Sequence, residues 1–140
     1  AKLETITFGD DFNQLIHALS QCAKLETITF GEKFNQPVDV LSQCAKLETI
    51  TFGDDFNQLI HALKSCVQLK TITFGKLFNQ PINALSLCVK LKTLTFSEMF
   101  DQHITDLLDS KSLVMITLRK SYPYATPDLE QKLIVLKKLY

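Results

Sequence analysis

The sequence has no tryptophan, and its 140 residues include only four glycines, four prolines and two methionines. So little glycine and proline excludes a collagen-like or low-complexity chain. Fifteen basic and fifteen acidic side chains balance, so the chain lacks the positive excess expected of a binder of nucleic acid or anionic membranes. No apolar run is long enough to span a membrane, and no signal peptide opens the chain. We therefore expect one globular domain whose partners include neither nucleic acid nor membrane.

The dominant feature of the sequence is an internal repeat. Four cysteines fall at positions 22, 44, 66 and 88, always 22 residues apart. Alignment on this interval gives rows that begin at residues 1, 23, 45, 67 and 89, and a divergent sixth row from 111. All ten phenylalanines fall in two columns, Phe8, Phe30, Phe52, Phe74, Phe96 and Phe12, Phe34, Phe56, Phe78, Phe100. A fixed period of this length predicts a solenoid, in which each row buries its apolar side chains against its neighbours.

Each row predicts a short strand followed by a short helical segment. In row one, the segment Leu3–Phe8 alternates apolar residues with threonine, which is typical of a strand. All rows run in the same direction, so the strands are expected to form a parallel sheet. Gly9 is then expected to supply a turn where a side chain would restrict the backbone. Phe12, Ile16 and Leu19 follow at helical spacing and predict one to two turns of α- or 3₁₀-helix on the outer face.

Differences between rows predict differences in this outer segment. Pro37 and Pro81 fit a first helical turn, and irregular structure is expected in their rows. Row five lacks proline and is expected to be the most helical. The asparagines form a column that is predicted to satisfy backbone groups in the turn after the strand, while the glutamines that follow them are expected at the surface. The asparagine column is Asn13, Asn35, Asn57 and Asn79, closed by Asp101.

The chain is expected to divide into six repeat rows, 1–125, and a C-terminal capping helix, 126–140. Thr126, Pro127 and Asp128 read as the start of that helix. Its apolar face would comprise Leu129, Leu133, Leu136 and Tyr140. Such a helix would cover the last open sheet edge; an amphipathic helix for a membrane or a partner is the alternative. No cap precedes row one, so self-association through this edge is an expected hazard. The chain begins with alanine, and an upstream part is therefore expected.

The rows resemble a known type of leucine-rich repeat. Their strand frame is L-x-T-I-T-F-G, and the next motif reads Phe-Asn-Gln-Pro at 34–37 and 78–81, Phe-Asn-Gln-Leu at 12–15 and 56–59, and Phe-Asp-Gln-His at 100–103. This resembles the FNIP subtype of social amoebae, other protists and giant viruses of amoebae, with glutamine in place of isoleucine. The resemblance implies an α/β leucine-rich-repeat solenoid with a parallel strand face. It also implies a protein-interaction surface, in some members joined to an F-box or kinase domain, and no catalytic residues.

No catalytic or metal-binding constellation emerges from the sequence. The cysteines share one column without a C-x-x-C pair, so buried free thiols in a reducing, cytoplasmic environment are expected rather than a zinc site or disulfides. His17 and His61 share a column but are a whole row apart, and His103 stands elsewhere. Each glycine stands alone, so there is no phosphate-binding loop. We therefore expect neither enzyme activity nor a cofactor.

The strand face is the candidate binding surface. Rows four and five differ most from the others: Lys70 and Lys92 replace glutamate before the strand, and Leu77 and Met99 replace charged residues in the turn. The candidate face comprises these four residues and the threonines Thr5, Thr7, Thr27, Thr29, Thr49, Thr51, Thr71, Thr73, Thr93 and Thr95. It would suit an acidic, partly apolar protein segment. A self-assembling structural array is the alternative, and ice binding through the T-x-T columns a remote one. Neutral sequence drift at solvent-exposed positions along the border of the face would explain the same substitutions.

Rows one and three agree at every residue from 1–19 to 45–63. This identity indicates a very recent duplication or a designed array.

Overall fold

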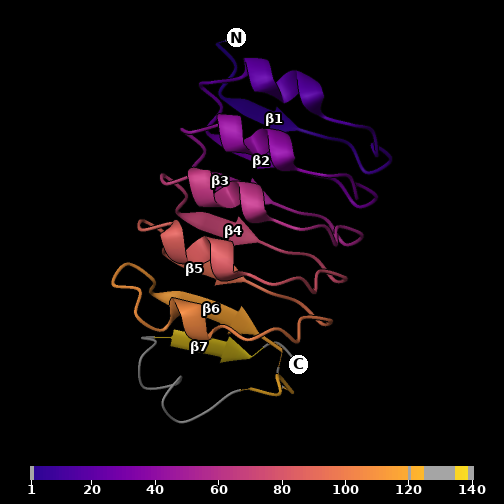
Figure 1. Cartoon of the computed structure of the whole chain (residues 1–140). Coiled ribbons are helices and arrows are strands. Elements are labelled where there is room, and N and C mark those ends of the chain that lie inside the picture. The colour runs from indigo at the N-terminus through magenta and orange to yellow at the C-terminus, as the bar shows by residue number, and fades with distance from the viewer. Residues whose placement is uncertain (1, 120, 125–134, 139–140) are drawn as a thin grey trace.

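The computed structural model describes residues 2–119, 121–124 and 135–138, and its core element is one parallel sheet of seven strands. The strands follow one another in chain order across the sheet (Figure 1). They are β1 (Thr5–Thr7), β2 (Thr27–Thr29), β3 (Thr49–Thr51), β4 (Thr71–Thr73), β5 (Thr93–Thr95), β6 (Met115–Leu118) and β7 (Val135–Lys138). The predicted stack of parallel rows is confirmed.

Neighbouring strands pair without any shift in register. Ile6 is opposite Ile28, Ile28 is opposite Ile50, and each flanking threonine is opposite its counterpart. Side chains alternate between the two faces of a strand, so the isoleucines point into the apolar core while the threonines point toward solvent. Ile28 and Ile50 are fully buried. The period-two pattern of the sequence therefore translates directly into one apolar and one hydroxyl-bearing face.

The outer segments are 3₁₀-helices: η1 (His17–Gln21), η2 (Asp39–Gln43), η3 (His61–Ser65), η4 (Asn83–Leu87) and η5 (Thr105–Leu107). Two expectations about them are wrong. Pro37 and Pro81 lie outside the helical turns, ahead of the N-cap residues Val38 and Ile82, and their rows are as helical as the others. Row five, expected to be the most helical, has the shortest turn, with three residues against five. Helical length therefore does not follow proline content.

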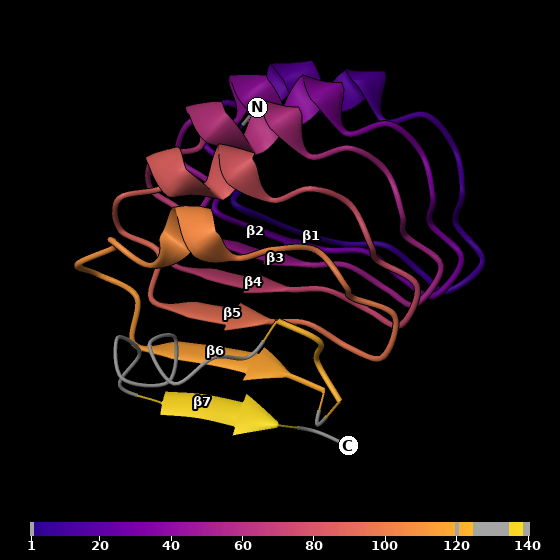
Figure 2. The same cartoon turned by 60° about the horizontal axis from the view of Figure 1, so that its bottom comes forward.

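Two columns of phenylalanine rings form the centre of the core. The ring centroids of Phe30 and Phe52 are 5.4 Å apart, and those of Phe34 and Phe56, in the other column, are 6.1 Å apart. Both spacings exceed the ~4.8 Å between neighbouring strands, so the separation of rows grows with distance from the sheet. The stack therefore curves with the strands on its inner side, and the 3₁₀ turns lie along the outer side (Figure 2).

The glycine column has a different cause from the one predicted. No glycine in the described residues has a positive φ, so the turn does not require glycine for its backbone conformation. A Cβ placed on Gly53 would lie 2.1 Å from the carbonyl oxygen of Gly31 in the row before it. A Cβ on Gly9, which has no row before it in the described chain, would meet nothing within 4 Å. Glycine is therefore required by the close approach of successive rows.

An amide ladder ties the turns together, as predicted for the asparagines. The side-chain Oδ1 of Asn35 accepts a hydrogen bond from the backbone N–H of Asn57, at 2.9 Å. Gln58 donates through Nε2 to the same Oδ1, at 3.1 Å, and to the Asn35 carbonyl oxygen, at 3.2 Å. The same contacts recur from row to row down to Gln102. The glutamines after row one, which were expected at the surface, are thus half-buried participants in the ladder.

The C-terminal segment differs from the predicted capping helix. Residues 135–138 form strand β7, which pairs in parallel with β6, instead of part of an amphipathic helix. Of the predicted helical face, Leu136 lies in this strand, and Leu129, Leu133 and Tyr140 lie outside the described residues. The backbone groups that β6 would leave unpaired at a sheet edge are satisfied by another strand.

Candidate interaction surface

The solvent-facing side of the sheet, on the inner side of the curved solenoid, carries two columns of threonines in register. They pair directly from β1 to β5, as Thr5, Thr27, Thr49, Thr71 and Thr93, and as Thr7, Thr29, Thr51, Thr73 and Thr95. These threonines are exposed in row one and half-buried in rows two to five. The columns therefore form one continuous, accessible, neutral surface along the solenoid.

The column that precedes the strands changes sign between rows three and four. Glu48 precedes β3, whereas Lys70 precedes β4 and Lys92 precedes β5. The ammonium of Lys70 forms an ion pair with the Glu48 carboxylate across the row boundary. Lys92 is exposed and has no ion pair within the described part of the chain. The positive charge predicted for this border is therefore partly neutralised at Lys70 and remains available at Lys92.

Leu77 and Met99 lie at the opposite border of the sheet. Both occupy the turn that follows a strand, and they are 41% and 47% exposed. An ion pair between Lys76 and Glu98, at 3.9 Å, joins the same two turns. The strands separate these residues from Lys70, so the structure does not bring the basic and apolar positions into one cluster. A partner that contacts both must cross the threonine face.

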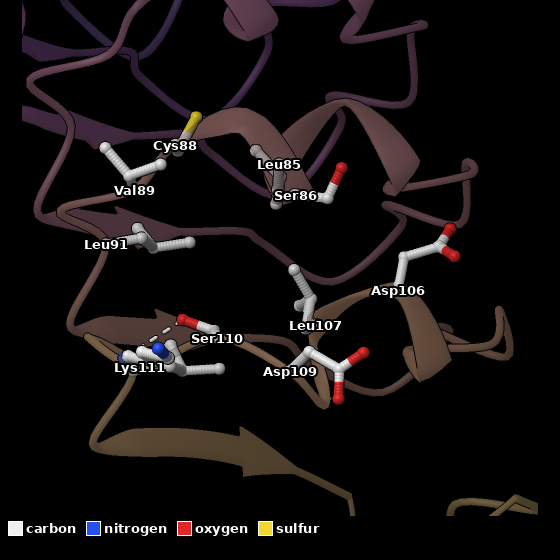
Figure 3. A pocket seen from close by; sticks show the side chains of 11 residues that line it. Leu85, Ser86, Cys88, Val89, Leu91, Asp106, Leu107, Asp109, Ser110 and Lys111 are labelled. Atoms are coloured by element: carbon white, nitrogen blue, oxygen red, sulfur yellow. Dashed lines mark hydrogen bonds between the residues drawn. The ribbon is translucent and has the colours of Figure 1, made fainter.

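A groove of about 410 Å³ lies on the helical side between rows four and five. Figure 3 shows Leu107 extending toward Leu85 across it, with Asp106 and Lys111 at its margin. The groove forms where the cysteine column ends: Ser110 replaces cysteine, is exposed, and accepts a hydrogen bond from the backbone N–H of residue 113. The shorter turn η5 leaves the rest of the space. The groove combines an apolar floor with charges of both signs.

Arg119 closes the amide ladder, a role that the repeat pattern of the sequence did not predict. The next backbone N–H in the ladder would belong to residue 123, which is Pro123 and has no N–H. The Arg119 guanidinium instead donates to the Asp101 carboxylate and to the carbonyl oxygen of Glu98. Tyr122 stacks on the last phenylalanine and donates its hydroxyl to a carbonyl oxygen at 2.7 Å. The proline at this ladder position is the feature of the sequence that could have predicted the end of the ladder.

An aromatic corner follows at the end of the described repeats. The ring centroids of His103 and Tyr124 lie 3.8 Å apart, and Tyr122 meets Tyr124 edge to face at 5.8 Å. These rings line a second cavity, of about 280 Å³. His103 therefore packs against an aromatic ring instead of sharing a site with the other histidines.

The cysteines are free thiols, as predicted, and three of them are buried. The Sγ atom of Cys66 donates to the Leu41 carbonyl oxygen, at 3.2 Å, and Cys88 makes the corresponding contact at 3.3 Å. Burial raises the pKa of Cys66 to about 12 and that of Cys88 to about 11. Because the thiolate is the nucleophile, these groups are chemically inert at neutral pH and serve the core.

The described residues hold no group of three or more histidine, cysteine, aspartate or glutamate side chains that is arranged to bind a metal ion. His17 and His61 are both exposed at the start of separate turns. None of the helical turns in the described ranges has the length and apolarity that a membrane crossing needs.

Comparison with solved structures agrees with this geometry. An internalin of Listeria monocytogenes (InlF) superposes with a TM-score of 0.70 at 16% identity, over 89% of this chain and 38% of its own length. Internalin C2 of the same organism gives 0.72 at 17% identity, over 89% of this chain and 56% of its own. CroV588, a circular leucine-rich-repeat protein, gives 0.59 at 29% identity, over 81% of this chain and 20% of its own.

The chain thus spans less than two thirds of each of these structures. No protein-family model matches the sequence, and no curated protein matches it. Together with the parallel rows of this chain, these superpositions identify its backbone architecture. The protein therefore has the leucine-rich-repeat fold.

Proposed function

We propose that this chain is a non-enzymatic interaction scaffold that binds a protein partner across the threonine face. The main support for this proposal is the continuous face of ten threonines in register, on the inner side of a curved solenoid. Repeat solenoids use such extended inner surfaces for binding. The free thiols are compatible with a reducing compartment such as the cytoplasm.

The two borders of this face suggest the chemistry of the partner. Lys92 offers an exposed ammonium at one border, and Leu77 and Met99 offer exposed apolar side chains at the other. An extended acidic segment with apolar residues toward one side satisfies both. The FNIP-type assignment is part of the same proposal, and the Phe-Asn-Gln motif of the rows supports it.

The test is selection from a displayed peptide library followed by titration of the enriched peptides. We expect acidic sequences to be enriched, and we expect the double variant Lys70→Glu/Lys92→Glu to bind them at least about tenfold more weakly. Lys64→Glu/Lys111→Glu, which reverses two exposed charges away from the sheet, is the matched control and should bind normally. Equal binding by both double variants would refute the assignment of this face.

The alternative of a self-assembling structural array predicts a mass that rises with concentration in sedimentation experiments, without any other partner. The remote alternative, ice binding, predicts thermal hysteresis. It requires a flat array, whereas the spacing of rows increases from 5.4 to 6.1 Å between the two phenylalanine columns.

A further inference from the structure

The groove between rows four and five marks a break in the repeat. Side chains of row four, row five and the start of row six line it, so it lies within the stack of rows. Its volume of about 410 Å³ falls in the range of ligand pockets, about 300–1,000 Å³. Four of the residues that line it are buried leucines, Leu85, Leu91, Leu107 and Leu113. The groove therefore offers apolar area that a side chain of another molecule can reach.

An exposed apolar patch adjoins this groove. It consists of Val67, Leu87 and Val89, which are 43%, 54% and 69% exposed, and Val89 also lines the groove. In rows one to three, the column of the two valines holds alanine, and the column of Leu87 holds glutamine or serine. The large apolar side chains are therefore confined to the rows that form the groove. Exposed apolar side chains that gather beside a groove are typical of an interaction site.

The break also leaves a backbone acceptor without its usual side-chain donor. In rows two to four, the cysteine Sγ donates to a leucine carbonyl oxygen of the row before it, as Cys88 does to Leu63. Ser110 takes the cysteine position in row five, but its hydroxyl accepts from the backbone N–H of residue 113 instead, at 3.2 Å. Among the described residues, no side chain donates to the Leu85 carbonyl oxygen. A polar hydrogen of a bound molecule can take the place of the missing thiol.

Charges of opposite sign lie at the two ends of the groove. Figure 3 shows Asp106 at one end and Lys111 at the other, and both side chains are exposed. Asp109 also lines the groove, but it already interacts with another group of the chain. Opposite charges at an interface determine which partner binds and in which orientation. The complementary ligand therefore places a basic group near Asp106 and an acidic group near Lys111, with apolar side chains between them.

We propose that the groove and the patch beside it bind a short apolar segment of another protein that carries a basic residue at one end and an acidic residue at the other. A peptide fits better than a small apolar molecule, because Val67, Leu87 and Val89 extend the apolar surface beyond the groove itself. A peptide backbone also supplies an N–H for the Leu85 carbonyl oxygen. This site lies on the helical side of the solenoid, away from the threonine face, so it goes beyond the proposed function and can fail independently of it.

The experiment titrates the isotope-labelled 140-residue chain with three capped peptides and follows its backbone amides by NMR. All three peptides contain Leu-Val-Leu in the centre. One has lysine at one end and glutamate at the other, one has lysine at both ends, and one has glutamate at both ends. We expect shifts around the groove, and we expect the lysine/glutamate peptide to bind about threefold or more tightly than the other two.

Reversal of either charge should change this preference in a defined direction. Asp106→Lys leaves two positive ends and should bind the glutamate/glutamate peptide best, whereas Lys111→Glu should bind the lysine/lysine peptide best. Both positions are exposed, so the fold tolerates either substitution. Asp39→Lys and Lys64→Glu reverse exposed charges of other rows in the same way. They are the matched controls and should keep the wild-type preference.

Val89→Lys tests the patch, since it removes the apolar side chain that the patch and the groove share. It should weaken binding of the lysine/glutamate peptide about fivefold or more, whereas Leu59→Lys, at a 51% exposed position of row three, should not. Absence of peptide binding at the groove, or the same order of preference in the wild type and both charge variants, overturns the proposal. Binding of hexanol in the groove with an affinity equal to that of the peptides also overturns it, in favour of a small apolar ligand.

Discussion

Glycine-to-alanine substitution at two positions with identical local sequence should have opposite effects on stability. Gly9 and Gly53 lie within the segment that rows one and three share without a difference. Neither has a positive φ, so alanine is compatible with the backbone at both. Among the described residues the two positions differ in the presence of a preceding row, which puts a carbonyl oxygen 2.1 Å from the Cβ position of Gly53, whereas that of Gly9 meets nothing within 4 Å.

The expected magnitudes follow from this difference. Gly9→Ala should stabilise the fold by about 0.4–1 kcal/mol, because alanine reduces the conformational entropy of the unfolded chain. Gly53→Ala should lose about 1–3 kcal/mol through overpacking, since two backbone segments must separate to admit the methyl group. Ser97 occupies the same column in row five, which indicates that such a separation is possible and that the cost is finite.

The assay is urea denaturation of both variants and the wild type, followed by far-ultraviolet circular dichroism. The free energies of unfolding of the two variants should differ by about 1.4–4 kcal/mol, with Gly53→Ala the less stable. Equal free energies for the two variants would refute the close-approach explanation. They would show instead that the glycine column serves the turn itself, as the sequence first indicated.

Three further predictions concern the core and the ladder. Phe56→Ala should lower the free energy of unfolding by about 3–5 kcal/mol. Phe12→Ala should lower it by clearly less, because the ring of Phe12 is only half-buried. Urea denaturation compares the two variants, and equal losses would contradict the burial argument. Asn57→Ala should lower the free energy of unfolding by about 1–3 kcal/mol, since Asn57 Oδ1 accepts hydrogen bonds from two donors of row four. An unchanged midpoint of urea denaturation would exclude a structural role for the ladder. Burial raises the pKa of Cys66 to about 12 and of Cys88 to about 11, from 9.0. Stability from these thiols should therefore be full below pH 9 and fall as the pH rises toward 11 and 12, because the unfolded thiols ionise first; a rise in stability over that range would oppose this.

Several features of the protein were determined by the sequence alone. The 22-residue period, the inward isoleucines, the phenylalanine columns and the asparagine ladder all depend on contacts between equivalent positions of adjacent rows. Since each row touches only its neighbours, a pattern that recurs in phase specifies these contacts without knowledge of distances. The free thiols, three of them buried, followed from the single cysteine column in the same way.

Other features were decided by the tertiary structure, because they depend on how far apart the rows lie and on what covers each end. The glycine column reflects a close backbone approach that no local rule contains. The 3₁₀ turns begin after Pro37 and Pro81, and the rows with and without proline at this position have turns of five residues, except for the shorter η5, so proline content does not set the helical length. Lys70 and Leu77 both distinguish row four from the earlier rows in the sequence, but they lie at opposite borders of the sheet. The strand at residues 135–138 replaces a predicted helix because an open sheet edge offers backbone hydrogen bonds that a helical pattern in the sequence cannot reveal.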